Sequence, residues 1–514
     1  MRIIDVRSVP QSILFLFCLS VMYLLMNSDA MALENDGFQF EVTISEEVQQ
    51  EPFTGRILIF FSDSEEPEPR FGSPLADLQP VIAVDVEDLE PGTPVVMDVD
   101  ELSHPVAKSF PEPFNNWDAD NWYIQAVADR EDRYRRSINE QPGNLYGETE
   151  EHFIDPGSDE IIELSLDYMA EEPSAPEDTE WVEKVEVRSE LLSEFHDRDV
   201  YMRAGVILPP GYHESEQEYP AVYVAPGFGG RHFRAWSWMD GNFGEKWKQG
   251  DFPMPMLRIV LDPDIRYGNS TFANSENNGP VGDALVEELI PAIEEQFRVD
   301  ARSDARFVKG HSSGGWASLW LQVTYPGFFG GTWSTGPDPV DFRRMQIINI
   351  YEDDNAYWDD HGYARPSMRV EDEILLSIRE ENKYEYVTGP GGQWISWFSV
   401  FSPQDEDGGP KKLWDQVTGE IDHEVAEAWK DYDIRMILEE NWDELEPHLQ
   451  GKIHIIGGIE DNYYLELALQ KLDDFLEDKD HGGYIEIHPG DHGSFRTPDL
   501  MMRIYEEMEE RYYE

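Results

Sequence analysis

The chain has 514 residues, with 106 Asp and Glu against 39 Lys and Arg, so its formal net charge is −67. At roughly 100–200 residues per domain, this length is enough for two or three domains with large hydrophobic cores. The content of 12% aromatic and 40% hydrophobic residues argues against a wholly disordered acidic chain. The charge argues against a nucleic-acid binder, because phosphate binding needs a basic stripe and the sequence has none.

The acidic residues are spread along the whole chain, and only 12 of the 39 basic residues are lysines. This pattern is typical of proteins that work in high salt, where a Debye length of roughly 3 Å at 1 M screens most of the self-repulsion. Simple solubility at moderate salt is the alternative interpretation. We therefore expect a halophilic protein with an acidic, solvated surface.

The first 30 residues have the layout of a secretory signal peptide. Arg2 and Arg7 precede an apolar run over residues 13–26, and Ala30 ends a small-residue cleavage site. A membrane span would need roughly 20 apolar residues, so an uncleaved anchor is the less favoured alternative. The single cysteine, Cys18, lies inside this run, so cleavage would leave no disulfide or cysteine metal site. We expect a secreted or periplasmic protein without stable membrane association after cleavage.

Residues 31–170 consist of short alternating segments broken by Pro, Gly and Asp. Residues 38–42, 56–61 and 122–127 alternate as strands do, and helical periodicity is weak. The pattern predicts an all-β accessory domain, a sandwich of immunoglobulin type. A linker rich in Pro and Glu is expected over residues 171–180.

Residues 181–514 alternate strand candidates with helical stretches. Residues 221–225 and 452–456 are strand candidates, and residues 283–297 have helical periodicity. This alternation predicts an α/β domain with a mostly parallel sheet covered by helices. Residues 341–451 contain six of the chain's 15 tryptophans and are too long for a plain loop, so they predict an inserted lid.

The chemistry of this domain is indicated by Gly310-His311-Ser312-Ser313-Gly314, which matches the pattern G-x-S-x-G. The motif follows a predicted strand and opens a predicted helix, which is the context of a serine on a tight, strained turn. The turn would expose the hydroxyl of Ser312, and the helix N-terminus favours developing negative charge. We predict Ser312 as the nucleophile, with the neighbouring Ser313 as its competitor.

A serine nucleophile needs a base and an orienting acid, which should follow it in the order serine, acid, histidine. Asp461 lies on a loop just after a predicted strand, with Glu460 as the alternative acid and a helix N-cap as the alternative role. His492 lies on the loop beyond the next strand, and His488 is the strand histidine of structural role. We therefore predict a triad of Ser312, His492 and Asp461.

An oxyanion hole needs two backbone N–H donors. Ser313, directly after the nucleophile, should provide one. The Gly-rich turn at residues 226–230 follows an early strand, and Phe228 N–H is the second candidate, although an ordinary turn is the alternative.

No metal or cofactor is predicted. Acid pairs such as Asp353-Asp354 and Asp359-Asp360 could bind calcium, but among 106 acidic residues such pairs occur by chance. The tryptophans of the insertion are interpreted first as lid core and second as a sugar platform. Trp394 and Trp397 are the two candidates for substrate contact.

These residues together resemble the esterase D / enterochelin esterase-like branch of the α/β-hydrolase family. The similar segments are residues 310–315, residues 226–230, the run from Asn277 to Glu294, and the regions around Asp461 and His492. The resemblance implies an α/β-hydrolase fold, hydrolysis of esters or thioesters, and a substrate-side role for Asn278, for which a helix-start turn is the alternative. The long insertion and the N-terminal domain depart from the family pattern and leave the substrate open.

The leading hypothesis is an exported serine esterase acting on a small-molecule or saccharide-linked ester, with no cofactor. Water would release the acyl-enzyme formed on Ser312. A serine peptidase or an acyltransferase with the same triad is the enzymatic alternative, and a non-catalytic binding protein on a hydrolase scaffold is the other class.

Overall fold

The computed structural model describes residues 37–72, 75–104, 106–174, 176–406 and 408–514. The predicted signal peptide, including Cys18, lies outside these residues. Within the described part of the chain, no helix is both long and apolar enough to cross a membrane.

The N-terminal part is built from two β-sheets that pack face to face. One sheet has the order β4-β1-β9, with β1 parallel to β9, and the other has the order β10-β7-β6-β2-β3-β5, with β8 paired to β6. The strands are β1 (Gln39–Ile44), β2 (Phe53–Ser62), β3 (Val81–Leu89), β4 (Pro94–Asp98), β5 (Lys108–Phe110), β6 (Asp120–Arg130), β7 (Leu145–Tyr146), β8 (Glu150–Ile154), β9 (Ile161–Leu166) and β10 (Tyr168–Met169), and a short α-helix, α2 (Val99–Leu102), follows β4. Alternate residues of β1, from Phe40 to Ile44, are buried between the sheets, as the predicted alternation requires.

The second part is organised around an eight-stranded sheet of order β11-β12-β14-β13-β19-β20-β23-β24. Strands β11, β12 and β14 pair antiparallel, and the remaining neighbours are parallel. Its strands are β11 (Val182–Ser189), β12 (Val200–Ile207), β13 (Ala221–Ala225), β14 (Leu257–Leu261), β19 (Arg306–His311), β20 (Gly331–Thr335), β23 (Ile453–Gly458) and β24 (Tyr484–His488). The predicted α/β arrangement, a mostly parallel sheet with helices, is confirmed.

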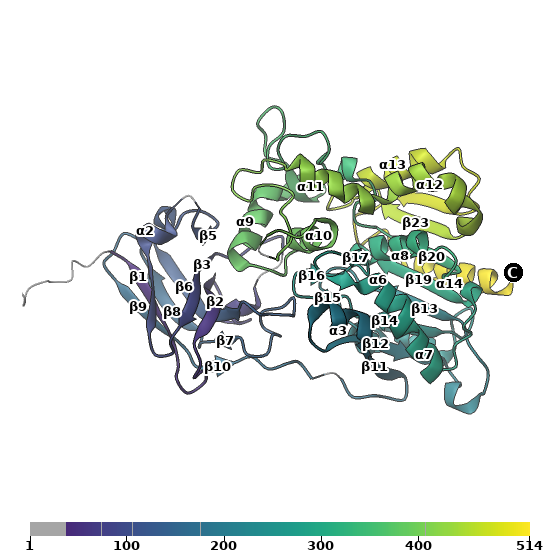
Figure 1. The fold of residues 1–514 in the computed structure, drawn as a ribbon, viewed down its shortest axis with the longest axis horizontal. Helices are drawn as coiled ribbons and strands as arrows, with labels where there is room; N and C mark the ends of the chain where they lie inside the picture. The colour runs from purple at the N-terminus through teal and green to yellow at the C-terminus, as the bar shows by residue number, and fades with distance from the viewer. Residues whose placement is uncertain (1–36, 73–74, 105, 175, 407) are drawn as a thin grey trace, which may run out of the picture.

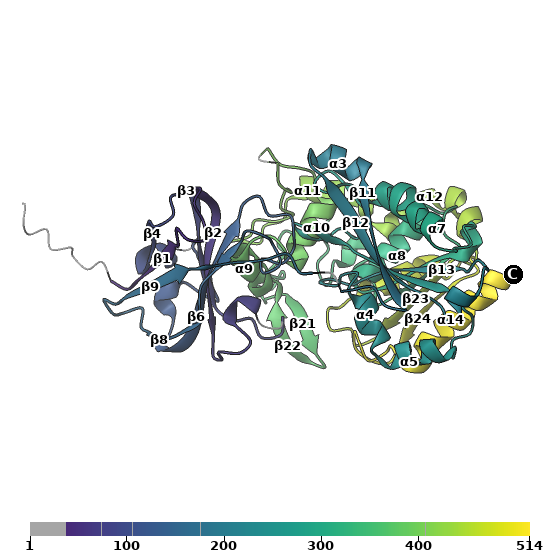
Figure 2. The same ribbon diagram turned by 90° about the horizontal axis from the view of Figure 1, so that it is seen from below.

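Helices cover both faces of this sheet (Figures 1 and 2). The first face carries α3 (Glu190–His196), α6 (Val281–Ala284), α7 (Ile290–Gln296), α8 (Ser313–Thr324) and α13 (Glu466–Leu476). The second face carries α4 (Arg234–Met239), α5 (Asn242–Gln249) and α14 (Pro498–Tyr513). Short two-residue strands, β15 (Asp264–Ile265), β16 (Gly268–Asn269), β17 (Asn274–Ser275) and β18 (Gly279–Pro280), lie in the connection after β14.

The segment between β20 and β23 forms a helical insertion that is part of the main core. It contains β21 (Pro366–Val370), β22 (Glu373–Ser377), α9 (Ile378–Thr388), α10 (Gln393–Phe401), α11 (His423–Ala428) and α12 (Ile434–Leu449). Five of its tryptophans are buried in one hydrophobic cluster with residues of α8, β23 and α13: Trp394, Trp397, Trp414, Trp429 and Trp442. Burial of an apolar cluster of this size stabilises the packing of the insertion against the sheet.

The insertion also joins the two parts of the molecule. Figure 1 shows α9 between the N-terminal sheets and the eight-stranded sheet. Leu58 and Phe60 of β2 pack with Val387 of α9, and the Arg56 guanidinium donates to the carbonyl oxygens of Tyr386 and Val387 at 2.9 Å. The N-terminal domain is therefore packed against the insertion rather than only tethered to it by residues 171–180.

Candidate active site

The predicted nucleophile lies on a strained turn between β19 and α8. Ser312 has φ 60° and ψ −127°, a positive-φ conformation outside the regions that non-glycine residues normally adopt. Its N–H donates to the carbonyl oxygen of Thr335 at 3.1 Å, and its own carbonyl oxygen accepts from Gly315 N–H at 2.7 Å. The turn is thus held by the neighbouring strand on one side and by the helix on the other.

The glycines of the motif are required by close backbone approach. A Cβ on Gly310 would lie 1.8 Å from the Gly314 carbonyl oxygen, and a Cβ on Gly314 would lie 2.0 Å from the Ala225 carbonyl oxygen. Both contacts are to backbone atoms of packed elements, which cannot move as a side chain can.

We expect Gly314→Ala to destabilise the fold by at least about 1–3 kcal/mol, because β13 must shift to admit the methyl group. Gly327→Ala is the matched control, since a Cβ at Gly327 meets no atom within 4 Å and should change stability by less than about 0.5 kcal/mol. Chemical denaturation of both variants measures the difference. Equal midpoints would contradict the assigned contact.

Asp461 and His492 come together at the carboxyl ends of β23 and β24. Asp461 Oδ2 lies 2.7 Å from His492 Nδ1, and the Asp461 side chain is buried. Asp461 Oδ1 also accepts from Tyr463 N–H at 2.9 Å, so the alternative role as a local cap is present as well. With Nδ1 engaged by the carboxylate, Nε2 is the ring nitrogen left for a substrate or a serine.

The alternative acid and histidine lie elsewhere. Glu460 is exposed, and His488 Nε2 contacts Glu486 on its own strand at 2.7 Å. Ser313, the competing serine, uses its hydroxyl to donate to Asp338 Oδ2 at 2.7 Å. Ser312 and His492 instead line one cavity.

Asp338 is a site residue that the sequence reasoning missed. It follows β20 and accepts from Ser313 Oγ, from Trp397 Nε1 at 3.1 Å, and from Ser312 Oγ at 3.4 Å. Burial raises the pKa of Asp338 to about 6, although the hydrogen bonds from Ser313 and Trp397 lower it. Its position just after a parallel strand was the available signal, because side chains at these strand ends converge.

His311, directly before the nucleophile, packs against the predicted base. The ring centroids of His311 and His492 are 4.5 Å apart, and His311 Nδ1 lies 3.0 Å from the Thr335 carbonyl oxygen. Burial, followed by the positive charge of Arg496, lowers the pKa of His311 to about 2. His311 is therefore a neutral packing partner of His492 at physiological pH.

The turn carrying Phe228 lies against the nucleophile. A Cβ on Gly227 would lie 3.4 Å from Ser312 Cβ, and Phe228 lines the same cavity as Ser312. Ser313, the other predicted donor, is the first residue of α8. Both predicted oxyanion donors therefore lie on backbone segments next to Ser312.

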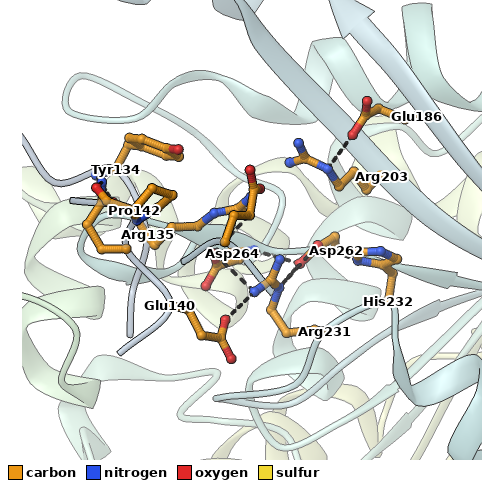
Figure 3. A network of polar contacts seen from close by, with 12 residues as sticks. Tyr134, Arg135, Glu140, Pro142, Glu186, Arg203, Arg231, His232, Asp262 and Asp264 are labelled. Carbon is orange, nitrogen blue, oxygen red and sulfur yellow. Dashed lines mark hydrogen bonds and ion pairs between the residues drawn. The ribbon is translucent and has the colours of Figure 1, made fainter. Parts of the chain in front are cut away.

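A network of charged residues ties this turn to the N-terminal domain (Figure 3). Arg231 follows the turn directly, and its guanidinium contacts Asp262 at 2.9 Å and Glu140 at 2.6 Å. Asp264 Oδ2 lies 3.7 Å from Arg231 and 3.6 Å from Arg135. Glu140 and Arg135 belong to the N-terminal domain, so that domain braces the turn on which Phe228 lies.

The two aspartates of this network titrate differently. Burial raises the pKa of Asp264 to about 6, because its charge partners are more than 3.5 Å away. Burial also opposes ionisation of Asp262, but His232 and Arg231 contact it directly and lower its pKa to about 2. Asp262 is thus the fixed anion to which Arg231 is anchored.

Two of the three predicted substrate contacts are wrong in placement. Trp394 is fully buried in the core, where its ring centroid lies 4.8 Å from that of Trp414, and it does not line the cavity. Asn278 is also buried, and its amide donates to the carbonyl oxygen and hydroxyl of Ser399 at 3.1 Å. Asn278 therefore holds α10 in place. Trp397 does line the cavity and contacts Asp338.

The cavity has a volume of about 630 Å³, which is the usual size of a small-molecule site. Three parts of the chain form its wall. The N-terminal domain, the α/β domain and the insertion contribute, among others, Arg136, Asn139, Phe228, Ser312, Trp397 and His492. Among the described residues, no group of three His, Cys, Asp or Glu side chains is arranged to hold a metal ion.

Comparison with known families decides the class of this domain. Residues 199–441 match the family model described as "Putative esterase". This segment of the α/β domain is therefore esterase-like. The matched segment includes Ser312 and ends before Asp461 and His492. The roles predicted for Asp461 and His492 are therefore supported only by their geometry. The resemblance to an esterase family within the α/β-hydrolases is thereby confirmed.

The solved structures that resemble this chain do so only weakly. A ferulic acid esterase is 11% identical with a TM-score of 0.41, covering 64% of this chain and 98% of its own. An S-formylglutathione hydrolase from Agrobacterium tumefaciens is 15% identical with a TM-score of 0.39, covering 65% and 98%. A fluorophosphonate-binding serine hydrolase of Staphylococcus aureus is 13% identical with a TM-score of 0.39, covering 64% and 97%. No curated protein is significantly similar in sequence to this chain.

Proposed function

We propose that this esterase hydrolyses a carboxylic ester through an acyl-enzyme on Ser312. The observation that supports it is the contact of 2.7 Å between Asp461 and His492, beside a serine on a strained turn that lines the same cavity. In this proposal Ser312 Oγ attacks the acyl carbonyl carbon as His492 Nε2 takes its proton. His492 then returns the proton to the leaving alcohol, and Asp461 holds the imidazole and stabilises its charged form.

The oxyanion of the tetrahedral intermediate would be bound by Phe228 N–H and Ser313 N–H. Neither amide donates a hydrogen bond to another group within the described residues. Their backbone segments are held by α8 and by the Arg231 network, so the donors need no reorganisation during the reaction. Deacylation repeats the sequence with water as nucleophile, and the carboxylic acid leaves.

Asp338 and Trp397 would form the acyl side of this site. The indole N–H of Trp397 is used by Asp338, so its ring offers the cavity an apolar edge. A small-molecule or saccharide-linked ester is the substrate class that we propose. The N-terminal residues Arg136 and Asn139 in the cavity wall would contact the part of the substrate beyond the scissile bond.

We propose further that the enzyme is exported and acts in saline surroundings. The N-terminal segment with signal-peptide layout supports secretion or a periplasmic location, and the net charge of −67 supports the halophilic interpretation. The N-terminal sandwich is proposed to be of immunoglobulin type, and the insertion is proposed to act as a lid over the active site.

The purified protein should react with a fluorophosphonate probe and release acid from at least one ester in a panel of aryl, feruloyl, acetyl-sugar and siderophore esters. Acid release in water without added alcohol separates a hydrolase from an acyltransferase. Amide substrates test the peptidase alternative. A protein that the probe does not label would be a binding protein on a hydrolase scaffold, and the proposal would be rejected.

A further inference from the structure

A second cavity, of about 540 Å³, lies behind the nucleophile turn on the side of the sheet covered by α4, α5 and α14. It adjoins the active-site cavity, because Gly227, Arg234 and His311 line both. Its wall contains the cations Lys309, Arg258 and Arg496 and the aromatic residues Trp238 and Tyr505. No role in the proposed hydrolysis accounts for these groups.

The two central cations project from inner positions of the sheet. Lys309 of β19 pairs with Val224, and Arg258 of β14 pairs with Val222, on either side of β13. Since residues two apart on a strand face the same way, both cations lie on one face of the sheet. That face is otherwise apolar, with Phe307 two residues before Lys309 in its core. Strand positions buried in this way are normally Val, Ile or Leu.

These cations have no acidic partner. Lys309 is 5% and Arg258 is 8% exposed, and neither forms an ion pair within the described part of the chain. Arg258 donates to the Tyr505 hydroxyl at 2.9 Å, and Lys309 Nζ lies 4.7 Å from the centre of the Tyr505 ring. The Nε atoms of Arg258 and Arg496 are buried without any acceptor.

Leaving positive charges buried and unpaired is costly, and this chain has 106 acidic residues with which it could have paired them. Burial, followed by the charges of Arg258 and Arg496, lowers the pKa of Lys309 well below its usual range. An anion in the cavity would remove this cost by supplying the missing charge and acceptors.

We propose that this cavity binds an oxyanion of the phosphate or sulfate type, free or as the charged group of a small molecule, through Lys309, Arg258 and Arg496. Guanidinium forks match the geometry of oxyanions and would give the orphaned Nε–H groups their acceptors. The volume far exceeds that of a halide ion, which argues against chloride as the natural occupant. The proposal is independent of the ester chemistry.

Isothermal titration calorimetry of the full chain tests this proposal, with sodium chloride held at matched ionic strength. Inorganic phosphate, sulfate and glycerol phosphate are titrated separately, and at least one should bind saturably. Lys309→Met and Arg496→Gln should each weaken that binding by about tenfold or more, because each removes a charge-assisted contact. Arg302→Gln is the control of equal charge change, since Arg302 is exposed and already paired with Asp300 at 2.7 Å.

Each outcome has one meaning. Binding of inorganic phosphate or sulfate indicates a free ion, and binding of glycerol phosphate alone indicates a small molecule with a charged group. Lys309→Met removes an unpaired buried charge, so its melting temperature should be equal to or higher than that of the wild type, which shows that it is folded. Absence of binding beyond the chloride background, or binding that both cavity variants retain, overturns the proposal.

Discussion

Replacement of Ser312 with alanine should lower kcat for a short-chain aryl ester by at least about 10⁴-fold, because a triad without its nucleophile keeps only binding and oxyanion stabilisation. The substitution removes one hydroxyl from a turn whose backbone is held by Thr335 and Gly315, so the fold should persist. Steady-state kinetics and labelling by a fluorophosphonate probe measure the loss.

Ser313→Ala is the matched control for this prediction. Its hydroxyl donates to Asp338, and its backbone N–H, the proposed oxyanion donor, is unchanged by the substitution. We expect a loss of about tenfold or less from the altered surroundings of Asp338. If Ser313→Ala loses as much activity as Ser312→Ala, or if Ser312→Ala still reacts with the probe, the assignment of the nucleophile is wrong.

Replacement of Asp461 with asparagine should lower kcat by about 10⁴-fold while KM changes little. The amide is nearly isosteric, but it cannot stabilise the imidazolium form of His492, and it favours the wrong ring tautomer. The side-chain oxygen can still accept from Tyr463 N–H, so the local cap and the fold should survive. This separation distinguishes a catalytic role from the alternative role as an N-cap.

Glu460→Gln controls for the loss of one negative charge at the adjacent position. Glu460 is exposed, so this variant should have nearly the activity of the wild type. Circular dichroism and the melting temperature verify the fold of both variants. A wild-type kcat for Asp461→Asn would contradict a catalytic role for Asp461. A large loss of kcat for Glu460→Gln would instead indicate that Glu460 is the acid of the triad.

Some predicted features are confirmed by the structure and by the match to the family model. These features depend on short-range patterns in the sequence. The alternation of strands and helices after residue 181 reflects the apolar periodicities of 2 and 3.6 residues, which local sequence displays directly. The tight turn around Ser312 was visible because Gly310 and Gly314 flank it at fixed spacing and a side chain there would collide with backbone atoms. Such steric requirements are local, so they leave a local signature.

The errors arose where the role of a residue depends on a distant partner. Trp394 and Trp397 are three residues apart in one helix, yet one is buried in the core and the other lines the cavity. Asn278 is bonded to Ser399, and Asp338 acquires its contacts from α8 and α10. No spacing in the sequence reports these pairings, because they are decided by how the insertion packs on the sheet.

By itself, therefore, the sequence determined the α/β class of the second part, the strained serine turn and the match of residues 199–441 to an esterase family. Tertiary structure alone decided that residues of the N-terminal domain and of the insertion line the cavity around Ser312. It also decided that Lys309 and Arg258 meet across β13 without an acidic partner. The physical reason is that steric and periodic constraints act over a few residues, whereas burial and charge pairing depend on which distant segments fold together.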